Sequence, residues 1–373
     1  MAPTVNVMDL GPDDPLHIAL FPGDGIGPEV IAATETVIDA VGLSVVWERH
    51  ALGATATGSD SLPREVLDAV RCTGVALKGP VSTVAGRSGG RSLNVALRQA
   101  LGIFAQVRPC RSRPGTLAAS AGVDLAVIRD TTEDLYAGVE FPAGAPETEA
   151  LIETMTALGR EVEAGSAIGI KPVSEAACRR LMEFAMGYAR RGGYQKVTIA
   201  HKATAMRATD GLFLEVAREV AAAEGDLECD DRQIDALCAD LVRRPEAFGV
   251  VATLNMYGDL LSDLAAAVTG GVGLAPGANY GDNVAVFEAV HGTAPRLAGA
   301  HRANPMAMVL TAALLLRHVG AIEQAGRLES AVDAVLDAGT TLTYDLVPAG
   351  QQPASTEDVA EALATIVEQG TAR

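Results

Sequence analysis

Short apolar runs alternate with amphipathic stretches along most of the chain. The runs are continuous rather than one-sided, which is typical of strands buried on both faces of a parallel sheet. They cover residues 17–21, 45–50, 75–78, 105–108, 125–129, 197–200 and 249–254. The stretches between them predict a helix that ends near Val41 and helices at 63–70, 92–101, 174–191, 210–224, 232–242 and 304–319. This alternation predicts a mostly parallel α/β sheet covered by helices on both faces.

One interval, Gly138 to Lys171, breaks the alternation. It contains an acidic amphipathic stretch from Glu147 to Glu163, followed by the segment Gly165 to Pro172. We interpret it as an excursion from the body of the protein that contributes to a dimer.

Length and composition fit a globular protein with a sizeable core. The chain has 373 residues, of which 49% are hydrophobic and 20% charged, enough for two domains or one large α/β domain. No apolar run is long enough to span a membrane, and the polar segment Met1 to Pro15 lacks the pattern of a signal peptide. Five cysteines without a C-x-x-C pair indicate a reducing compartment, so we expect a cytoplasmic protein.

The charge is strongly acidic overall but unevenly distributed. A net charge of −18 argues against nucleic acid and anionic membranes as partners. Between Asp68 and Asp124 there is no acidic residue, and this basic island contains Arg71, Lys78, Arg87, Arg91, Arg98, Arg108, Arg111 and Arg113. The island is a candidate site for a small polyanion, and the alternative is a positively charged surface without a function.

Two aspartates four residues apart, Asp259 and Asp263, follow the apolar run 249–254. We expect Gly258 to end that run and a helix to follow, with both carboxylates on one face of its first turns. Paired carboxylates at the carboxyl end of a buried strand suggest a site for Mg²⁺ or Mn²⁺. The alternative is that they complement the helix dipole and cap free N–H groups.

The turn Gly23 to Glu29 is similar to a dinucleotide-binding loop but a poor match to one. Pro28 occupies the place of the third glycine in G-x-G-x-x-G, and Asp24 would repel a pyrophosphate. We therefore interpret it as a structural turn.

Three arginines, Arg98, Arg108 and Arg129, come at or near the ends of predicted elements. Ser92 and Asn94 lie in the first turn of the helix that carries Arg98, where free N–H groups favour anions. Together these residues predict a clamp for two or three carboxylates. The alternative is that each arginine pairs with an acid on the surface.

Two candidate proton-transfer residues also follow predicted strands. Lys202 comes directly after the run 197–200, and Tyr136 comes a few residues after Arg129. Further along, a loop of small residues follows His291, namely Gly292, Thr293 and Ala294. Such a loop would let a cofactor approach the backbone closely.

Taken in order, these segments resemble the isocitrate and 3-isopropylmalate dehydrogenase family of metal-dependent β-decarboxylating enzymes. The resemblance extends from about His17 to Pro348. It rests on Gly23 to Glu29, Arg91 to Arg98, Arg129 to Tyr136, His201-Lys202, Asn255 to Asp263 and Glu288 to Asn304. It implies a two-domain fold distinct from the Rossmann fold of G-x-G-x-x-G dehydrogenases. The expected division is a large cofactor-binding domain (1–103 and 270–373), a small domain (104–137 and 175–269) and a dimerisation clasp (138–174).

The resemblance also assigns roles to the candidate site residues. Ser92 and Asn94 match residues that hold the distal carboxylate of isocitrate, while Arg98, Arg108 and Arg129 match the clamp for the other carboxylates. The metal ligands would be Asp259 and Asp263, with Asp235 contributed by the partner subunit. Lys202 likewise matches a residue donated across the dimer, and Tyr136 matches the tyrosine that protonates the enol after loss of CO₂.

For the cofactor, the resemblance implies NADP, with NAD as the alternative. His291 and Asn304 match residues at the adenine end, and Gly292, Thr293 and Ala294 form the cofactor loop. Arg296 and Tyr344 suit a 2′-phosphate, and the long clasp also resembles that of NADP-dependent bacterial isocitrate dehydrogenases. Leu297 and Pro348 depart from the NADP pattern at the places of a tyrosine and an arginine.

The resemblance therefore implies a homodimeric, cytoplasmic isocitrate dehydrogenase that forms 2-oxoglutarate and CO₂, as in the tricarboxylic acid cycle. Two alternatives stay open. One is a sister dehydrogenase for an isocitrate analogue, because Thr204 replaces an asparagine and Asp130-Thr131 replaces Glu-Asn. The other is a non-catalytic regulatory subunit, against which Lys202, Tyr136 and the three acids argue.

Overall fold

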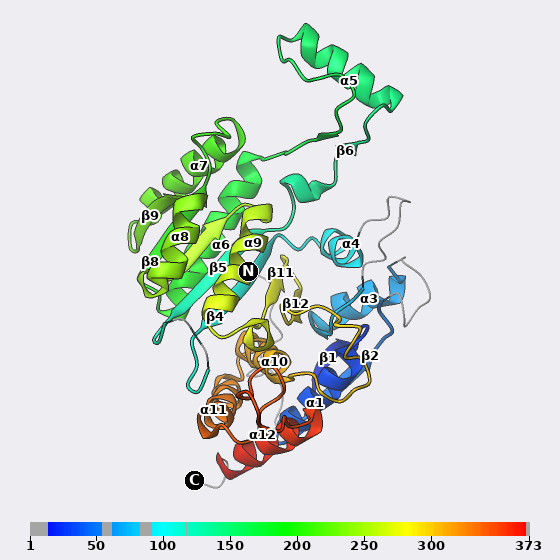
Figure 1. Ribbon diagram of the computed structural model, residues 1–373, viewed down its shortest axis with the longest axis vertical. Helices are drawn as coiled ribbons and strands as arrows, with labels where there is room; N and C mark the ends of the chain where they lie inside the picture. The colour runs from blue at the N-terminus through cyan, green and yellow to red at the C-terminus, as the bar shows by residue number, and fades with distance from the viewer. Residues whose placement is uncertain (1–13, 54–61, 83–91, 117, 119, 371–373) are drawn as a thin grey trace.

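A single ten-stranded mixed sheet runs through the body of the protein, with helices on both faces (Figure 1). The computed structural model describes residues 14–53, 62–82, 92–116, 118 and 120–370. Arg87 and Arg91 of the basic island lie outside the described residues.

The strands of the large sheet are β1 (Leu16–Phe21), β2 (Val45–Arg49), β3 (Val75–Lys78), β4 (Ala105–Arg111), β5 (Asp124–Asp130), β8 (Lys196–His201), β9 (Glu228–Gln233), β10 (Val250–Thr253), β11 (Ala278–Tyr280) and β12 (Ala285–Glu288). Their spatial order is β2-β1-β3-β12-β11-β4-β5-β10-β8-β9. Neighbouring strands are parallel except around β4 and β11, where β12–β11, β11–β4 and β4–β5 are antiparallel. The predicted mostly parallel α/β sheet is confirmed.

The helices are α1 (Gly27–Asp39), α3 (Arg64–Thr73), α4 (Leu93–Ala100), α5 (Pro146–Ala157), α6 (Glu175–Gly192), α7 (Thr209–Glu224), α8 (Ile234–Arg243), α9 (Asn255–Val268), α10 (Met306–His318), α11 (Ile322–Ala338) and α12 (Thr356–Gly370). Short 3₁₀ turns occur at η2 (Leu135–Ala137), η3 (Pro245–Ala247) and η4 (Val272–Leu274).

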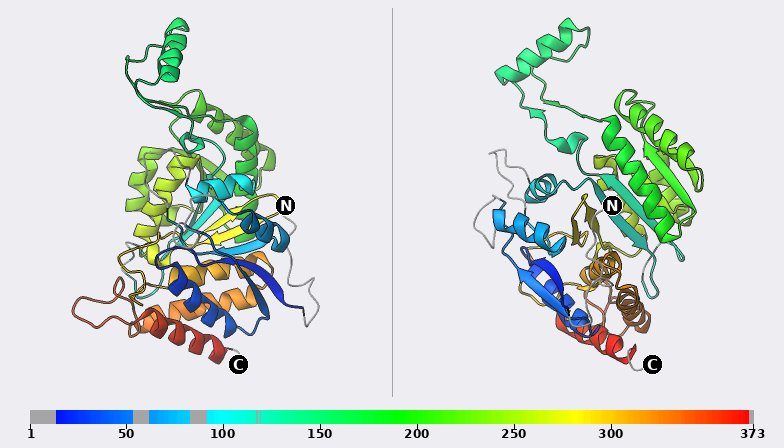
Figure 2. Two further views of the ribbon diagram at one scale, coloured as in Figure 1. Left: turned by 90° about the vertical axis from the view of Figure 1, so that its right-hand side faces the viewer. Right: turned by 180° about the vertical axis from the view of Figure 1, so that it is seen from behind.

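The sheet is covered by apolar side chains on both faces, and it divides into two halves. In the half formed by β1, β3 and β12, one face packs against α1, α10, α11 and α12, and the other against α3 and α4. In the half formed by β4, β5, β8 and β10, helices α6 and α7 cover one face and α8 and α9 the other. This two-sided burial explains why the strands read as continuous apolar runs. Figure 2 shows the same layers from the side and from behind.

Several elements carry too little sequence signal to have been predicted. Strand β9 is polar (Glu-Cys-Asp-Asp-Arg-Gln) because it lies at the edge of the sheet. Strands β11 and β12 are only three and four residues long. The helical stretch expected at 147–163 ends earlier, at Ala157 in α5. Helix α5 projects from the body on two extended segments, which pair as β6 (Glu140–Phe141) and β7 (Ile168–Gly169) (Figure 1).

Our expectation for the start of α9 is wrong in one respect. Gly258 does not end the preceding run; it lies inside the helix, which begins at Asn255, so Asp259 and Asp263 lie in its second and third turns. A Cβ added to Gly258 would lie 2.2 Å from the Cβ of Arg129. Glycine is therefore required here because α9 lies directly against the side chain of Arg129 on β5.

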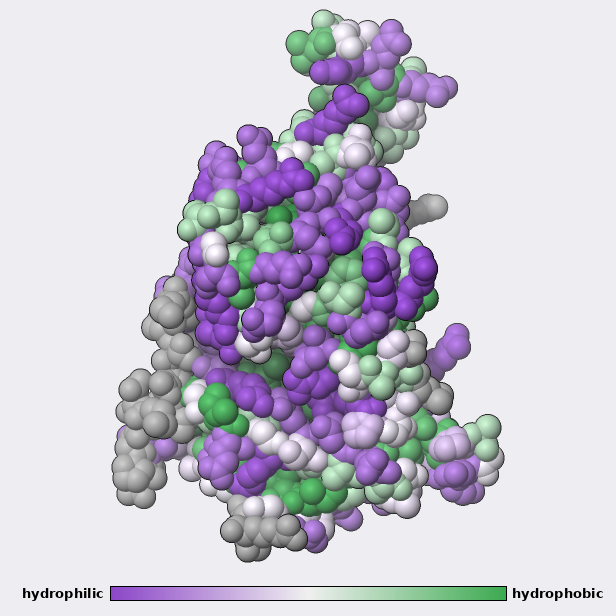
Figure 3. Space-filling view, turned by 90° about the vertical axis from the view of Figure 1, so that its left-hand side faces the viewer, coloured by the Kyte–Doolittle hydropathy of each residue, from purple (hydrophilic) through white to green (hydrophobic). Residues whose placement is uncertain are grey.

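The surface on the side of α7 and α8 is predominantly polar, with apolar side chains in small, separate groups (Figure 3). Within the described ranges, every helix is too short or too polar to cross a bilayer.

We predict that Gly258→Ala pushes α9 away from β5. The added methyl would collide with Arg129, so the free energy of unfolding should fall by about 1–3 kcal/mol, as for other overpacked sites. Denaturant titration measures this change. The matched control is Gly326→Ala in α11, where no atom lies within 4 Å of the added Cβ. It should be neutral or stabilising by up to about 1 kcal/mol, and equal effects of the two substitutions would contradict the packing argument.

Candidate active site

The three clamp arginines come from three elements that meet at the centre of the sheet. Arg98 extends from α4, Arg108 from β4 and Arg129 from β5. Arg98 donates to Asn279 Oδ1 (3.1 Å) and Glu288 Oε1 (2.9 Å), and Arg108 donates to Gln106 Oε1 (3.2 Å). None of these acceptors belongs to the surface, so the alternative of simple surface ion pairs does not hold for Arg98.

A buried carboxylate that we did not predict, Glu288, organises this cluster. Its Oε2 accepts from Lys78 Nζ at 2.6 Å, and its Oε1 accepts from Arg98 and from Asn279 Nδ2 (3.1 Å). Burial works to raise the pKa of Glu288, but the charges of Lys78 and Arg98 outweigh it and hold the pKa well below its ordinary value. Lys78 and Glu288 each end an apolar strand, and the parallel pairing of β3 with β12 places them side by side as register partners.

The arginines are close enough to repel one another. Burial, together with the charges of Arg98 and Arg108, lowers the pKa of Arg129 to about 10. Burial also lowers the pKa of Arg108, with the charge of Arg98 adding to the effect. A bound polyanion would stabilise the charges of Arg108 and Arg129 in this cluster.

Asp259 and Tyr136 meet beside Arg129. Tyr136, in η2, donates its hydroxyl to Asp259 Oδ2 at 2.9 Å, and Asp259 Oδ1 forms an ion pair with Arg129. Partial burial works to raise the pKa of Asp259, but Arg129 and the bond from Tyr136 outweigh it and hold that pKa below its ordinary value. Burial and the negative charge of Asp259 raise the pKa of Tyr136. Tyr136 is therefore a protonated hydroxyl at neutral pH, next to an ionised carboxylate.

Asp263 lies one turn further along α9, with Arg108 Nη1 at 3.5 Å from its Oδ1. The two aspartates project from the same helix face, but neither caps the helix; Asp134 does so by accepting from Met256 N at 2.8 Å. Two hard oxygen donors on one face suit Mg²⁺ or Mn²⁺. Among the described residues, no third His, Cys, Asp or Glu completes a metal-binding group within this chain.

The remaining predicted acid, Asp235, pairs instead with Lys202. Lys202 Nζ lies 2.7 Å from Asp235 Oδ1 and 3.5 Å from Gln233 Oε1, and Thr204 donates to the same Gln233 oxygen at 2.7 Å. The bond from Lys202 lowers the pKa of Asp235. Lys202, partly exposed, and Asp235, exposed, thus form an ion pair at the end of the edge strand β9.

Ser92 and Asn94 lie at the start of α4, as predicted. Ser92 is the N-cap residue, but its side chain makes no capping bond. Asn94 Oδ1 is buried and has no hydrogen-bond partner among the residues that the structure describes. A buried amide oxygen without a partner is costly, so this position suits a ligand that would satisfy it.

The glycine turn, residues 23–29, packs against the loop 291–294. Ile26 N donates to Thr293 O at 3.0 Å, and a Cβ on Gly25 would lie 2.0 Å from that oxygen. In the loop, Ala294 has a positive φ of 37°, and His291 Nε2 is buried with no partner in the described part of the chain. Burial lowers the pKa of His291, so its neutral ring offers Nε2 to a ligand.

The other predicted cofactor residues lie around the same loop. Asn304 donates to Asp345 Oδ2 at 3.0 Å. Tyr344 is exposed beneath the guanidinium of Arg302, whose carbon lies 5.6 Å from the ring centre. Arg296 and Gly292 are also accessible at the surface. These positions fit a ligand that lies along the loop surface.

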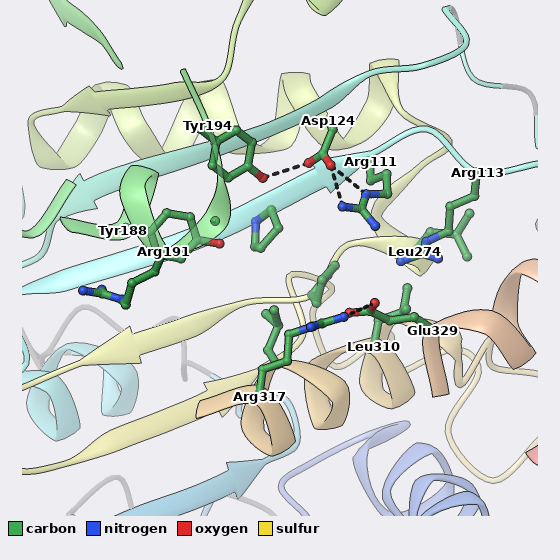
Figure 4. A pocket seen from close by; sticks show the side chains of 14 residues that line it. Arg111, Arg113, Asp124, Tyr188, Arg191, Tyr194, Leu274, Leu310, Arg317 and Glu329 are labelled. Carbon is green, nitrogen blue, oxygen red and sulfur yellow. Dashed lines mark hydrogen bonds and ion pairs between the residues drawn. The ribbon is translucent and has the colours of Figure 1, made fainter. Parts of the chain in front are cut away.

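A separate cavity of about 300 Å³ lies on the opposite face of the sheet. Side chains alternate along β4 and β5, so Arg111 and Asp124 face α6, whereas Arg108 and Arg129 face α9. In this cavity Asp124 accepts from Arg111 and from Tyr194 (2.8 Å), and Arg317 pairs with Glu329 (Figure 4). Four arginines line this cavity, and two of them, Arg111 and Arg317, pair with its two acids, Asp124 and Glu329.

We predict that Glu288→Gln strongly destabilises the protein. Lys78, almost wholly buried, would lose its only carboxylate contact among the described residues, and the expected loss is about 3–5 kcal/mol at pH 7. Because the pKa of Glu288 is lowered by folding, its contribution is complete above about pH 4.5 and is lost as the pH falls further. The stabilities of the two proteins should therefore converge in acid, as denaturant titrations across pH would show. Glu323→Gln, at the exposed start of α11, is the control and should change little.

The chain is similar to known proteins over most of its length. The model of the isocitrate/isopropylmalate dehydrogenase family matches residues 17–363. The probable mitochondrial isocitrate dehydrogenase [NAD] subunit alpha of Caenorhabditis elegans is 38% identical over 350 residues, which cover 93% of this chain and 92% of the relative. The isocitrate dehydrogenase [NADP] of Archaeoglobus fulgidus is 37% identical over 366 residues, covering 90% and 88%.

Solved structures agree as well. The isocitrate dehydrogenase from Methylococcus capsulatus superposes with a TM-score of 0.85 at 41% identity, covering 95% of this chain and 99% of that one. The TT0538 protein from Thermus thermophilus gives a TM-score of 0.87 at 35% identity, covering 98% and 71%. On the family match and these relatives, the chain belongs to the isocitrate/isopropylmalate dehydrogenase family.

Proposed function

We propose that the protein is a metal-dependent isocitrate dehydrogenase that oxidises and decarboxylates isocitrate to 2-oxoglutarate and CO₂. The observation that carries this proposal is the set of three mutually repelling arginines next to the Tyr136–Asp259 pair. A tricarboxylate would match the clamp in charge, and the tyrosine would act at the carbon from which CO₂ leaves.

Substrate binding would use residues from α4, β4 and β5, and the metal would be held from α9. Arg98, Arg108 and Arg129 would hold carboxylates by charge-assisted hydrogen bonds. Ser92 and the unsatisfied amide of Asn94 would bind the distal carboxylate. Asp259 and Asp263 would hold the divalent cation, together with Asp235 of the partner subunit. The cation would supply Lewis acidity at the hydroxyl and carboxylate oxygens it binds.

Two residues of the protein would move protons. Lys202 of the partner subunit would accept the hydroxyl proton as hydride leaves the substrate for the nicotinamide. After the carbon–carbon bond to the departing carboxylate breaks, its electron pair stays on the substrate as an enolate. Tyr136, whose hydroxyl is protonated at neutral pH, would then donate its proton to that carbon.

For the cofactor we favour NADP. The exposed Arg296 and Tyr344 flank the loop 291–294 and would suit a 2′-phosphate, while His291 and Asn304 would lie at the adenine. The named relatives include both NAD and NADP enzymes. NAD is therefore the alternative.

The proposed enzyme is a cytoplasmic homodimer with shared active sites. Lys202 and Asp235 lie apart from the Asp259 cluster in one chain, which supports a role in the partner's site. We propose that the projecting segment 138–174 is the clasp between subunits, attached to a small domain (104–137 and 175–269) beside a large one (1–103 and 270–373).

A second candidate is a sister dehydrogenase for an isocitrate analogue with another distal anion. The observation in its favour is Thr204, which shares the oxygen of Gln233 with Lys202. This departure from the family pattern lies next to a proposed catalytic group.

A steady-state assay of a substrate panel tests the proposal. It would compare isocitrate, homoisocitrate, isopropylmalate, tartrate and a phosphonate analogue, each with NAD and NADP and with Mg²⁺ or EDTA. We expect isocitrate with NADP and Mg²⁺ to give the highest kcat/KM.

Asp259→Asn should abolish turnover at every Mg²⁺ concentration while the fold stays intact by circular dichroism. Asp240→Asn, on α8, is the control and should keep full activity. Retention of most turnover by Asp259→Asn would reject the assignment.

Complementation between subunits tests the shared site. Mixed dimers of one Asp259→Asn chain and one Lys202→Met chain would contain one site with both defects and one intact site. After unfolding and random reassociation, two inactive variants should therefore recover about a quarter of the wild-type activity. No recovery, with mixed dimers demonstrated by native mass spectrometry, would show that Lys202 acts within its own chain.

A further inference from the structure

A buried lysine that none of the roles above uses, Lys171, lies at the junction of the clasp with the body. It follows β7 and comes three residues before the N-cap of α6, Ser174. Its side chain is only 7% exposed. Lysine is rarely buried without a specific reason, because the ammonium group must be paired.

Three groups surround this ammonium. Lys171 Nζ lies 2.5 Å from Asp210 Oδ1, 3.6 Å from Asp134 Oδ1 and 4.7 Å from the centre of the Tyr257 ring. Both aspartates are almost completely buried. Burial disfavours the charge of Lys171, but the bond to Asp210 and the charge of Asp134 outweigh it, so the pKa of Lys171 lies above its ordinary value.

On one side, the cluster leads to Tyr136. Asp134 has φ 70° and ψ −167°, a conformation that is essentially restricted to glycine. Its carboxylate accepts from Leu135 N and Met256 N, both at 2.8 Å, and its own N–H donates to Pro172 O. Asp134 thus attaches η2, which contains Tyr136, to the first turn of α9, which contains Asp259.

On the other side, the cluster leads to Lys202. Asp210, near the start of α7, uses Oδ1 for Lys171 and Oδ2 for the backbone N–H of Lys202, at 2.7 Å. The position of the Lys202 backbone therefore depends on the same carboxylate that neutralises Lys171.

We propose that Lys171 is a positioning residue that holds Tyr136 and Lys202 in fixed relation to each other through Asp134 and Asp210. The inference rests on the proposed function. In the proposed dimer, Tyr136 serves the active site of its own chain, whereas Lys202 serves that of its partner. The ion cluster of one subunit therefore aligns one proton-transfer group in each of the two active sites.

The test compares Lys171→Met with the double variant Lys171→Met/Asp210→Asn in the full-length dimer. The single variant leaves two buried carboxylates without their cation and should lower Tm. The double variant removes one charge of each sign, so Tm should recover. Its kcat should nevertheless stay about 10- to 100-fold below wild type, because small misplacements of catalytic groups are costly. KM for isocitrate should change less than about twofold, since the arginine clamp is untouched.

The matched control removes another lysine–aspartate pair, Lys196 and Asp230, which lie 2.9 Å apart on β8 and β9. Lys196→Met/Asp230→Asn should keep the wild-type kcat. A double variant at Lys171 and Asp210 that regains both Tm and kcat would show a purely structural role and overturn the inference. Lack of isocitrate turnover by the wild-type protein would instead reject the proposed function, so the two failures are distinguishable.

Mixed dimers test the link between subunits. When one chain carries Tyr136→Phe, only the site of the other chain works, and that site uses Lys202 of the Tyr136→Phe chain. Adding Lys171→Met/Asp210→Asn to the Tyr136→Phe chain should lower the remaining kcat by a further factor of about 10. An unchanged kcat would show that the cluster does not position Lys202.

Discussion

Helix α9 lies directly against strand β5 because Gly258 has no side chain, and the geometry of the candidate active site depends on this contact. The close approach brings Asp259 to Arg129 and to the hydroxyl of Tyr136. A helix one methyl group further from the sheet would separate the carboxylate from both partners. The backbone of β5, buried between α6 and α9, is too constrained by packing on both faces to compensate.

A row of polar residues crosses the middle of the sheet and gives this contact its electrostatic setting. Lys78 pairs in register with Glu288, Asn279 with Gln106, and Gln106 with Arg129. Glu288 neutralises Lys78 and anchors Arg98, so one carboxylate makes it feasible to bury several cations together. This explains how a chain with a net charge of −18 gathers several cations in one place: the few acids beside them, Glu288, Asp259 and Asp263, each pair with a cation.

The strands that are buried on both faces of the sheet could be predicted from the sequence. Strands β1, β3 and β5 are continuous apolar runs, and they were predicted to within one residue. Strand β9 was not predicted, because an edge strand can be polar, and β11 and β12 are too short to show a period.

For the site, the strand-end arginines and the spacing of Asp259 and Asp263 were visible in the sequence. Glu288 and Asp134 were not recognised, because their roles arise from contacts with residues far away along the chain, such as Lys78 and Met256.

The pairing of β12 with β3 has a consequence for how the protein is made. Val75 lies beside Ala285, so the first three strands gain their inner neighbour only after most of the chain has left the ribosome. Until then, the apolar edge of β3 is exposed and open to pairing with other chains. Correct folding should therefore depend on the time between the synthesis of β3 and that of β12. Slow translation of the segment between them would favour aggregation over the native sheet.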